Sequence, residues 1–131
     1  MVKASSRTKP SVAARIAGYG LPVGAAAAEY VDRVLADPAF RRWRAMGLTV
    51  RYDPEPYRLD LHRGAWPGPA PIPARAVERG PSENAACPYS GKPVTNYMEM
   101  QGRVFGFCNA FCRDKTVLDA AAWPRFMAIL R

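Results

Sequence analysis

The sequence contains few of the side chains on which metal binding and acid–base catalysis depend. Its 131 residues include only three cysteines and one histidine, and 11 acidic residues stand against 19 lysines and arginines. The carboxylates are isolated along the chain and form no pair of the kind that general acid–base catalysis uses; examples are Asp32, Asp53, Glu55 and Asp60. No complete catalytic constellation is present, so the sequence favours a binding function over an enzymatic one.

Long apolar segments are also absent. No run approaches the ~20 residues that a membrane-spanning helix needs, and the basic start of the chain lacks the compact apolar segment of a secretory signal. We therefore expect no membrane insertion and a cytoplasmic location. Thiols in a reducing cytosol favour metal–thiolate bonding over disulfides, and an odd number of cysteines also argues against a disulfide framework.

The positive charge is scattered rather than organised. The formal net charge is +8, and four basic residues precede the first acidic residue, Glu29. This balance permits weak, salt-sensitive attachment to nucleic acid or anionic membranes. The basic residues are not interleaved with aromatic residues along a helix or strand, however, so we expect no specific nucleic-acid recognition.

Proline divides the chain. Seven of the 13 prolines lie between residues 54 and 81, which excludes one continuous helix or a central strand there because proline lacks the N–H donor. We expect an α+β protein of four segments: a basic flexible N-terminus, a helical segment, a proline-rich linker and a cysteine-containing module. Their ranges are 1–20, 21–52, 53–86 and 87–131.

The helical segment is expected to hold a helical pair. Residues 24–36 show the apolar periodicity of an amphipathic helix, with an apolar face of Tyr30, Val31, Val34 and Leu35. Asp37 is a good N-cap and Pro38 a good first residue for a second helix over 38–46. Phe40 and Trp43 share one face of that helix, where we expect both to pack on the first.

The C-terminal module is expected to contain a hairpin and two helices. Residues 94–100 and 103–107 read as strands, a helix follows to about residue 117 with Asn109 as its cap, and Asp119 is expected to cap a last helix over 120–130. A hairpin followed by a helix is the order of elements in a treble clef. The apolar face of the last helix could dock a protein partner, and the sequence leaves the oligomeric state open.

The cysteines are spaced as Cys87-x20-Cys108-x3-Cys112. Two of them lie one turn apart at a helix start, where both sulfurs can face one point and the helix N-terminus favours the thiolate. Thiolates suit zinc, and also copper or another soft ion. We expect Arg103, Arg113 and Lys115 to offset their charge. Metal binding is therefore the leading interpretation, and a metal-free remnant or thiol redox chemistry are the alternatives.

The fourth ligand of a tetrahedral site is not evident. A second cysteine three residues after Cys87 would supply it, but this chain has Ser90 at that position. Asp114, the distant His62, a water or a partner molecule are the other candidates. A site with an open fourth position could hold zinc, copper or another soft ion.

The segment CPYSGKPV…GRVFGFCNAFCRDKT…DAAAWPRFMAIL resembles the YHS/TRASH group of treble-clef domains. The resemblance covers about residues 85–131: a first cysteine in a CPxxG-type turn, an aromatic strand ending in FCxxxC, and a helix. It implies metal binding or sensing, with Cys87, Cys108 and Cys112 at the ligand positions. Ser90 departs from the variants with a second cysteine there, and Pro124 departs from the usual proline position.

The segment GLPVGAAAAEYVDRVLADPAFRRWRAMGL is similar to the end of the glutathione S-transferase C-terminal domain. This resemblance covers only about residues 20–50 and includes none of the thioredoxin-like half that supplies the glutathione site. It implies an alternative function, that of a transferase-related fragment acting only with a missing or separate N-terminal half.

Overall fold

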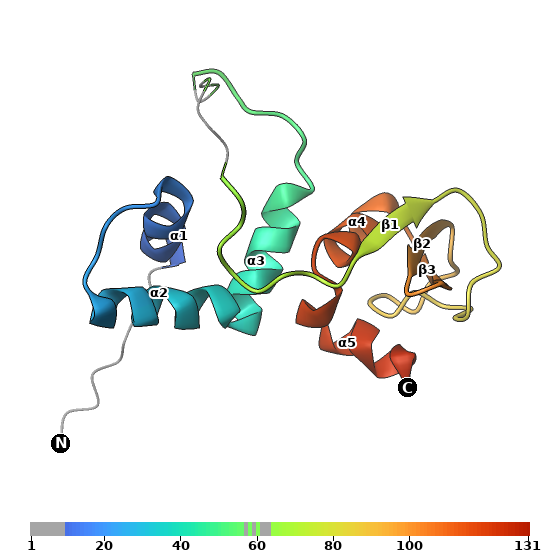
Figure 1. Cartoon of the computed structure of the whole chain (residues 1–131). Helices are drawn as coiled ribbons and strands as arrows, with labels where there is room; N and C mark the ends of the chain where they lie inside the picture. Colours follow the sequence, from blue (N-terminus) through green and yellow to red (C-terminus); the bar gives the residue numbers. More distant parts are fainter. Residues whose placement is uncertain (1–9, 57, 59, 61–63) are drawn as a thin grey trace.

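The chain folds as an α+β protein, and the predicted class is confirmed. The computed structural model describes residues 10–56, 58, 60 and 64–131. Within them, helices α1 to α3 lie toward one end of the molecule, and a three-stranded sheet lies with α4 and α5 toward the other (Figure 1). No helix in the described part of the chain is long and apolar enough to cross a membrane.

The N-terminal part contains three helices: α1 (Pro10–Tyr19), α2 (Ala25–Ala36) and α3 (Pro38–Leu48). Their small core consists of Ala13, Val31, Val34, Leu35 and Phe40. The expected helix break at Asp37 is present, because its Oδ1 accepts hydrogen bonds from the N–H groups of Ala39 at 2.8 Å and Phe40 at 3.1 Å. These two bonds satisfy amide groups at the start of α3 that have no partner within the helix.

Two features of this part differ from expectation. The segment 1–20 was expected to be basic and flexible; its residues 1–9 lie outside the described part, and its residues 10–19 form α1, in which the buried Ala13 joins the apolar contacts of α2. Trp43 leaves 52% of its surface exposed and Tyr30 leaves 36%, so neither belongs to the core. The Trp43 ring contacts the core through Phe40, with 5.5 Å between the two ring centroids.

The sheet consists of three antiparallel strands in the order β1 (Ala74–Val77), β2 (Asn96–Met100) and β3 (Arg103–Phe107). The turn between β2 and β3 uses Gln101 and Gly102, whose φ angles of 54° and 73° are those that a two-residue hairpin turn requires. β1 lies inside the segment that was expected to be a linker. Its short length and edge position make it compatible with the prolines around it.

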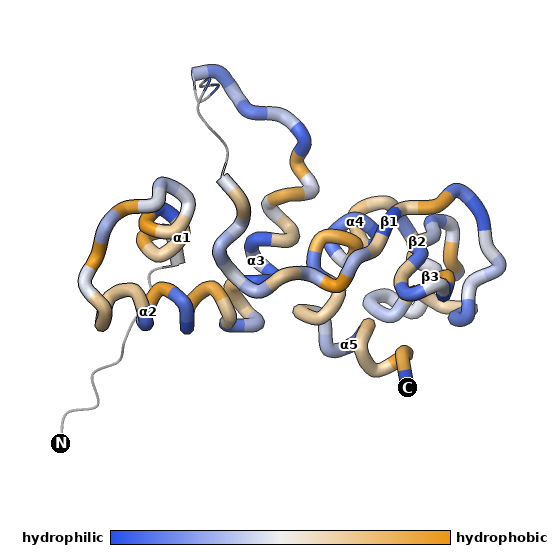
Figure 2. The backbone as a smooth tube through the Cα atoms, in the orientation of Figure 1, coloured by the Kyte–Doolittle hydropathy of each residue, from blue (hydrophilic) through white to orange (hydrophobic). Residues whose placement is uncertain are grey.

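The C-terminal core lies between the sheet and the helices that follow it. Met98, Met100, Phe105 and Phe107 are almost fully buried, and Phe126 of α5 (Pro124–Met127) packs edge-on against Phe105 at 5.2 Å. The helix α4 (Ala110–Leu118), which precedes α5 in the chain, contacts all three strands. Figure 2 shows hydrophobic and hydrophilic residues alternating along α4 and the strands of this part.

The last predicted helix is broken into three short pieces: η1 (Ala120–Ala122), α5 and η2 (Ala128–Leu130). Pro124 accounts for the break before α5, because it cannot donate to the carbonyl four residues earlier and begins α5 instead. Asp119 makes no capping hydrogen bond. The prediction that it caps a continuous helix is therefore wrong.

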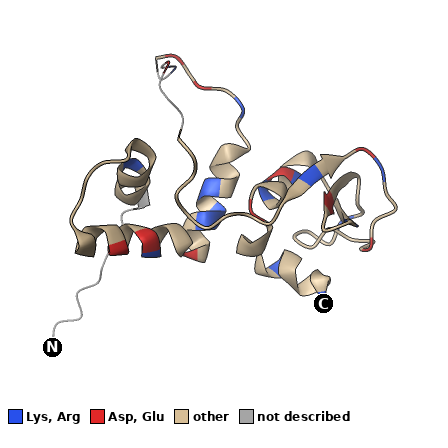
Figure 3. Ribbon diagram, viewed as in Figure 1, with Lys and Arg blue, Asp and Glu red and all other residues tan. Residues whose placement is uncertain are grey.

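The Asp119 carboxylate instead binds a guanidinium from the N-terminal part. Arg41 of α3 donates from Nε to Oδ2 at 2.8 Å and from Nη2 to Oδ1 at 2.6 Å. Only 5% of the Asp119 side chain and 18% of the Arg41 side chain are exposed. Arg42 adds a bond to the carbonyl of Ala122 at 3.1 Å. Arg41 and Arg42 thus link α3 to the segment that follows α4, and Figure 3 shows basic residues along α3.

The proline-rich segment also returns to α3. Trp66 is half-buried, stacks on Phe40 with 6.3 Å between ring centroids, and carries the Arg44 guanidinium 3.7 Å above its ring. Such cation–π contacts stabilise by about 0.5–2 kcal/mol. The proline-rich segment is therefore fixed to α3 at Trp66, before the chain enters β1.

We expect Asp119→Asn to lower the free energy of unfolding by about 3 kcal/mol, because removing one partner of a buried ion pair leaves an uncompensated charge. Urea unfolding followed by circular dichroism measures this. The matched control is Glu99→Gln, which breaks the exposed pair with Arg75 and should cost less than about 1 kcal/mol. Equal costs for the two substitutions would contradict the role assigned to the Arg41–Asp119 pair.

Candidate metal centre

The three cysteines converge on one point although they come from three separate elements. Cys87 lies in the turn before β2, Cys108 directly follows β3, and Cys112 lies in the first turn of α4. Their sulfur atoms are all within 4.8 Å of one another, and those of Cys108 and Cys112 are 3.9 Å apart. Sulfurs bound tetrahedrally to zinc at about 2.3 Å would lie about 3.8 Å apart. The cluster therefore has dimensions that could hold a metal ion.

A tight turn positions Cys87. Its N–H donates to the carbonyl of Lys92 at 2.8 Å, and its own carbonyl accepts from the N–H of Gly91 at 2.9 Å. Gly91 has a φ of 71°, a conformation that glycine adopts without steric cost. The turn is closed by a bridge between Ala86 and Pro93. This backbone geometry directs the Cys87 sulfur toward the start of α4.

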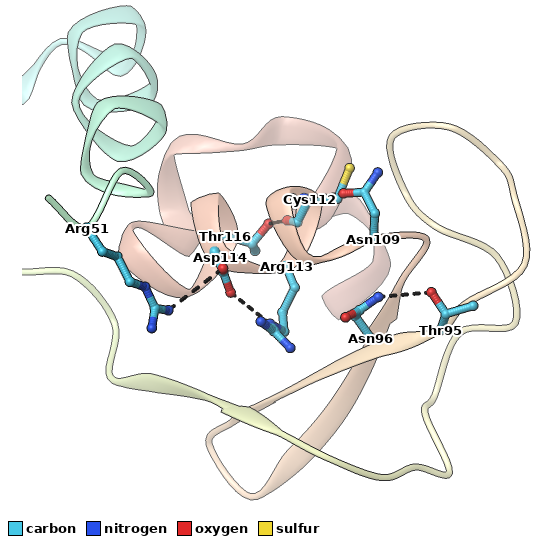
Figure 4. Close-up of polar contacts among 8 residues, drawn as sticks. All are labelled: Arg51, Thr95, Asn96, Asn109, Cys112, Arg113, Asp114 and Thr116. Carbon is cyan, nitrogen blue, oxygen red and sulfur yellow. Dashed lines mark hydrogen bonds and ion pairs between the residues drawn. The ribbon is translucent and has the colours of Figure 1, made fainter.

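The start of α4 positions the other two sulfurs. Asn109 is the N-cap, as predicted: its Oδ1 accepts from the N–H of Cys112 at 2.8 Å. Its Nδ2 donates to the sulfur of Cys108 at 3.5 Å, so one side chain orients both cysteines. Figure 4 shows Asn109 beside Cys112 at this end of the helix. In addition, Thr116 donates to the carbonyl of Cys112 at 2.8 Å.

The local environment favours the thiolate at Cys87. Burial by itself raises the pKa of this thiol, but the N–H groups of Cys108, Tyr89 and Ser90, together with the Ser90 hydroxyl, outweigh burial and lower its pKa to about 6. Several converging donors can stabilise an anion in this way. The turn therefore provides an anionic sulfur near neutral pH before any metal binds.

Cys112 has the opposite tendency. Burial, a hydrogen bond with Cys108 and the negative charges of Cys87 and Cys108 raise its pKa to about 11, against a lowering by the positive charge of Lys115. Like charges crowded into one site disfavour further ionisation. A bound cation would remove that penalty, because metal binding requires and stabilises deprotonated thiols.

The candidates for the fourth ligand are placed differently. The Ser90 hydroxyl lies 3.2 Å from the sulfur of Cys108, on the exposed side of the cluster. Asp114 is turned away from the sulfur of Cys112 and is bound by Arg113 at 2.8 Å and Arg51 at 3.8 Å (Figure 4). His62 lies outside the described residues. Of the described candidates, Ser90 is thus the one that lies beside the sulfurs.

Two of the three cations expected to offset the charge of the thiolates form ion pairs with carboxylates instead. Arg103 binds Glu83 at 2.7 Å, and Arg113 binds Asp114. Lys115 is the one of the three whose charge acts on Cys112. The sequence analysis also missed the amide groups of Tyr89 and Ser90, although a glycine-containing turn directly after a cysteine is a known way to expose such donors to an anion.

We expect one thiolate per chain to form near pH 6 in the metal-free protein and to be absent in Cys87→Ser, as measured by the ultraviolet absorbance of thiolate against pH. The folded-state pKa of Cys87 lies below its ordinary value of 9.0, so its contribution to stability is complete above pH 9.0 and is lost as the pH falls through about 6. The unfolding free energy should therefore rise between these values, and less so in Cys87→Ser.

Two observations would contradict this assignment. One is a first thiolate that appears only near pH 9.0, the ordinary value for cysteine. The other is an unchanged titration in Ser90→Ala, because loss of the hydroxyl donor should shift the pKa of Cys87 upward. Cys112, whose pKa is raised, acts in the opposite sense and reduces stability only as the pH rises above 9.0.

Comparisons with known proteins add no relative to this picture. Neither the family models, nor the curated proteins, nor the solved structures include a significant match to this chain.

Proposed function

We propose that the protein binds one zinc ion, or a similar soft ion such as copper, through Cys87, Cys108 and Cys112. The observation that carries the proposal is the approach of the three sulfurs to within 4.8 Å of one another. Thiolate sulfur is a preferred ligand of zinc and of monovalent copper. The resemblance of residues 85–131 to YHS/TRASH domains leads to the same ligand set.

The number and exposure of the ligands favour metal handling over a purely structural site. Structural zinc sites are closed by four protein ligands, whereas sites with three keep a position for another molecule. Cys87 and Cys112 are buried, but Cys108 is only half-buried and Ser90 is exposed. The side of the cluster formed by Cys108 and Ser90, called the open side below, therefore offers a path by which an ion or an incoming ligand can reach the sulfurs.

The C-terminal core has apolar contacts that involve none of the three cysteines. The ring of Phe126 packs against those of Phe105 and Phe107, with 5.2 Å and 6.0 Å between ring centroids, so apolar burial holds the sheet against the helices. A site in a preformed frame of this kind can release its ion without unfolding the chain. We propose that the ion is exchanged with a partner or a smaller ligand through the open side.

We expect native mass spectrometry of protein purified without chelator to show one zinc per chain. Cys108→Ser and Cys112→Ser should each abolish it, because two thiolates cannot hold zinc as three do. The control is Thr95→Ala, which removes an exposed hydroxyl that donates to the Cys108 carbonyl at 3.0 Å and leaves all sulfurs in place. A wild-type protein that binds neither zinc nor copper, even after reduction and reloading, would refute the proposal.

We also expect Ser90→Cys to bind zinc at least about tenfold more tightly than the wild type, because it adds a fourth thiolate, and Ser90→Ala to bind about tenfold more weakly. Competition with a chromophoric chelator measures both. Asp114→Asn is the matched control and should leave the affinity unchanged. Loss of zinc in Asp114→Asn but not in Ser90→Ala would instead assign the fourth position to the carboxylate.

A further inference from the structure

A separate pocket lies beside the metal centre. It has a volume of about 430 Å³ and is lined by Tyr89, Lys115, Trp123, Pro124 and Arg125. This volume lies within the range of small-molecule sites. The pocket shares no cysteine with the cluster, although Tyr89 and Lys115 belong to the same turn and helix as the metal ligands.

The walls of the pocket are aromatic and rigid. The rings of Tyr89 and Trp123 meet edge to face, with 5.7 Å between centroids. The Tyr89 hydroxyl shares a hydrogen bond of 2.6 Å with Thr116, and the Trp123 indole N–H donates to the carbonyl of Lys115 at 3.1 Å. Both polar groups are therefore satisfied, so the rings present mainly apolar surface to a ligand.

The pocket also carries two cations that have no carboxylate partner among the described residues. The Lys115 ammonium lies 4.0 Å from the Tyr89 ring centre and 4.2 Å from that of Trp123. Arg125 is exposed and uses one nitrogen, Nη1, to donate to the Tyr89 carbonyl at 3.0 Å. Among the residues that the structure describes, no carboxylate pairs with either side chain. The site has positive charge left for an anion.

We infer that this pocket binds a small organic carboxylate with an aromatic or similarly flat apolar body. The carboxylate would be held by Lys115 and by the free nitrogens of Arg125, which match its two oxygens. The apolar body would lie on Pro124 and the ring edges. Single-stranded nucleic acid fits less well, because stacking needs open ring faces and only 8% of Trp123 is exposed.

The test is a titration with benzoate, followed by the amide resonances of nitrogen-labelled protein. We expect saturable shifts centred on the indole N–H of Trp123. Lys115→Met and Arg125→Gln should each weaken binding by about tenfold or more, because each removes a charged hydrogen-bond donor. Lys92→Gln is the matched control: it removes an exposed lysine that does not line the pocket and should leave the affinity unchanged.

Four further ligands make the inference falsifiable. Benzamide lacks the charge and acetate lacks the ring, so both should bind at least about tenfold more weakly than benzoate. Equal binding of benzamide would overturn the anion site, and equal binding of acetate or inorganic phosphate would overturn the need for an apolar body. If a single-stranded oligonucleotide bound more tightly than benzoate, the inference would be wrong and the pocket would be a nucleic-acid site.

The zinc content of the wild type and of Arg125→Gln is measured in the same samples. Because the pocket contains no metal ligand, Arg125→Gln should weaken benzoate binding while keeping its zinc. Lys115→Met is used for the benzoate titration alone, because Lys115 also lowers the pKa of Cys112. Benzoate binding that disappears only when zinc is removed, and survives both substitutions, would place the ligand on the metal instead and overturn the inference. Arg125→Gln keeps the test valid even if Lys115→Met fails to fold, because Arg125 is exposed.

Discussion

The hydrogen bond between the Tyr89 and Thr116 hydroxyls, 2.6 Å long, is the contact on which both sites depend. It joins the turn that carries Cys87 to the helix that carries Cys112, and Thr116 passes the connection on to the Cys112 carbonyl. The same bond fixes the ring that forms one wall of the aromatic pocket. The cysteine cluster and the pocket therefore share this junction.

The charges around this junction are arranged for anions on both sides. Burial raises the pKa of Cys87, but amide groups of the turn and of Cys108 together with the Ser90 hydroxyl lower it to about 6, which favours an anionic sulfur near neutral pH. On the other side of Tyr89, Lys115 and Arg125 remain without acidic partners in the described chain. Lys115 also lowers the pKa of Cys112. An anion bound at Lys115 would weaken that effect and thereby couple the pocket to the thiols.

Local features were predictable from the sequence because their causes lie within a few residues. Asp37 and Asn109 cap their helices as expected, and the Gln101–Gly102 turn joins two strands near their predicted bounds. Features with distant causes were not predictable. Asp119 looked like a cap, yet its partner Arg41 is 78 residues away, and β1 is a strand only because β2 lies beside it. The resemblance of residues 20–50 to glutathione S-transferases stays a prediction.

The sequence by itself determined which thiols could meet, because the spacing of Cys108 and Cys112 on one helix turn is a local property. Only the tertiary structure decided that Cys87 joins them, that Ser90 rather than Asp114 lies beside the sulfurs, and that Lys115 stands over two aromatic rings. The physical reason is the same in each case. Hydrogen bonds and apolar packing between distant segments, which no short pattern encodes, set the direction in which each side chain points.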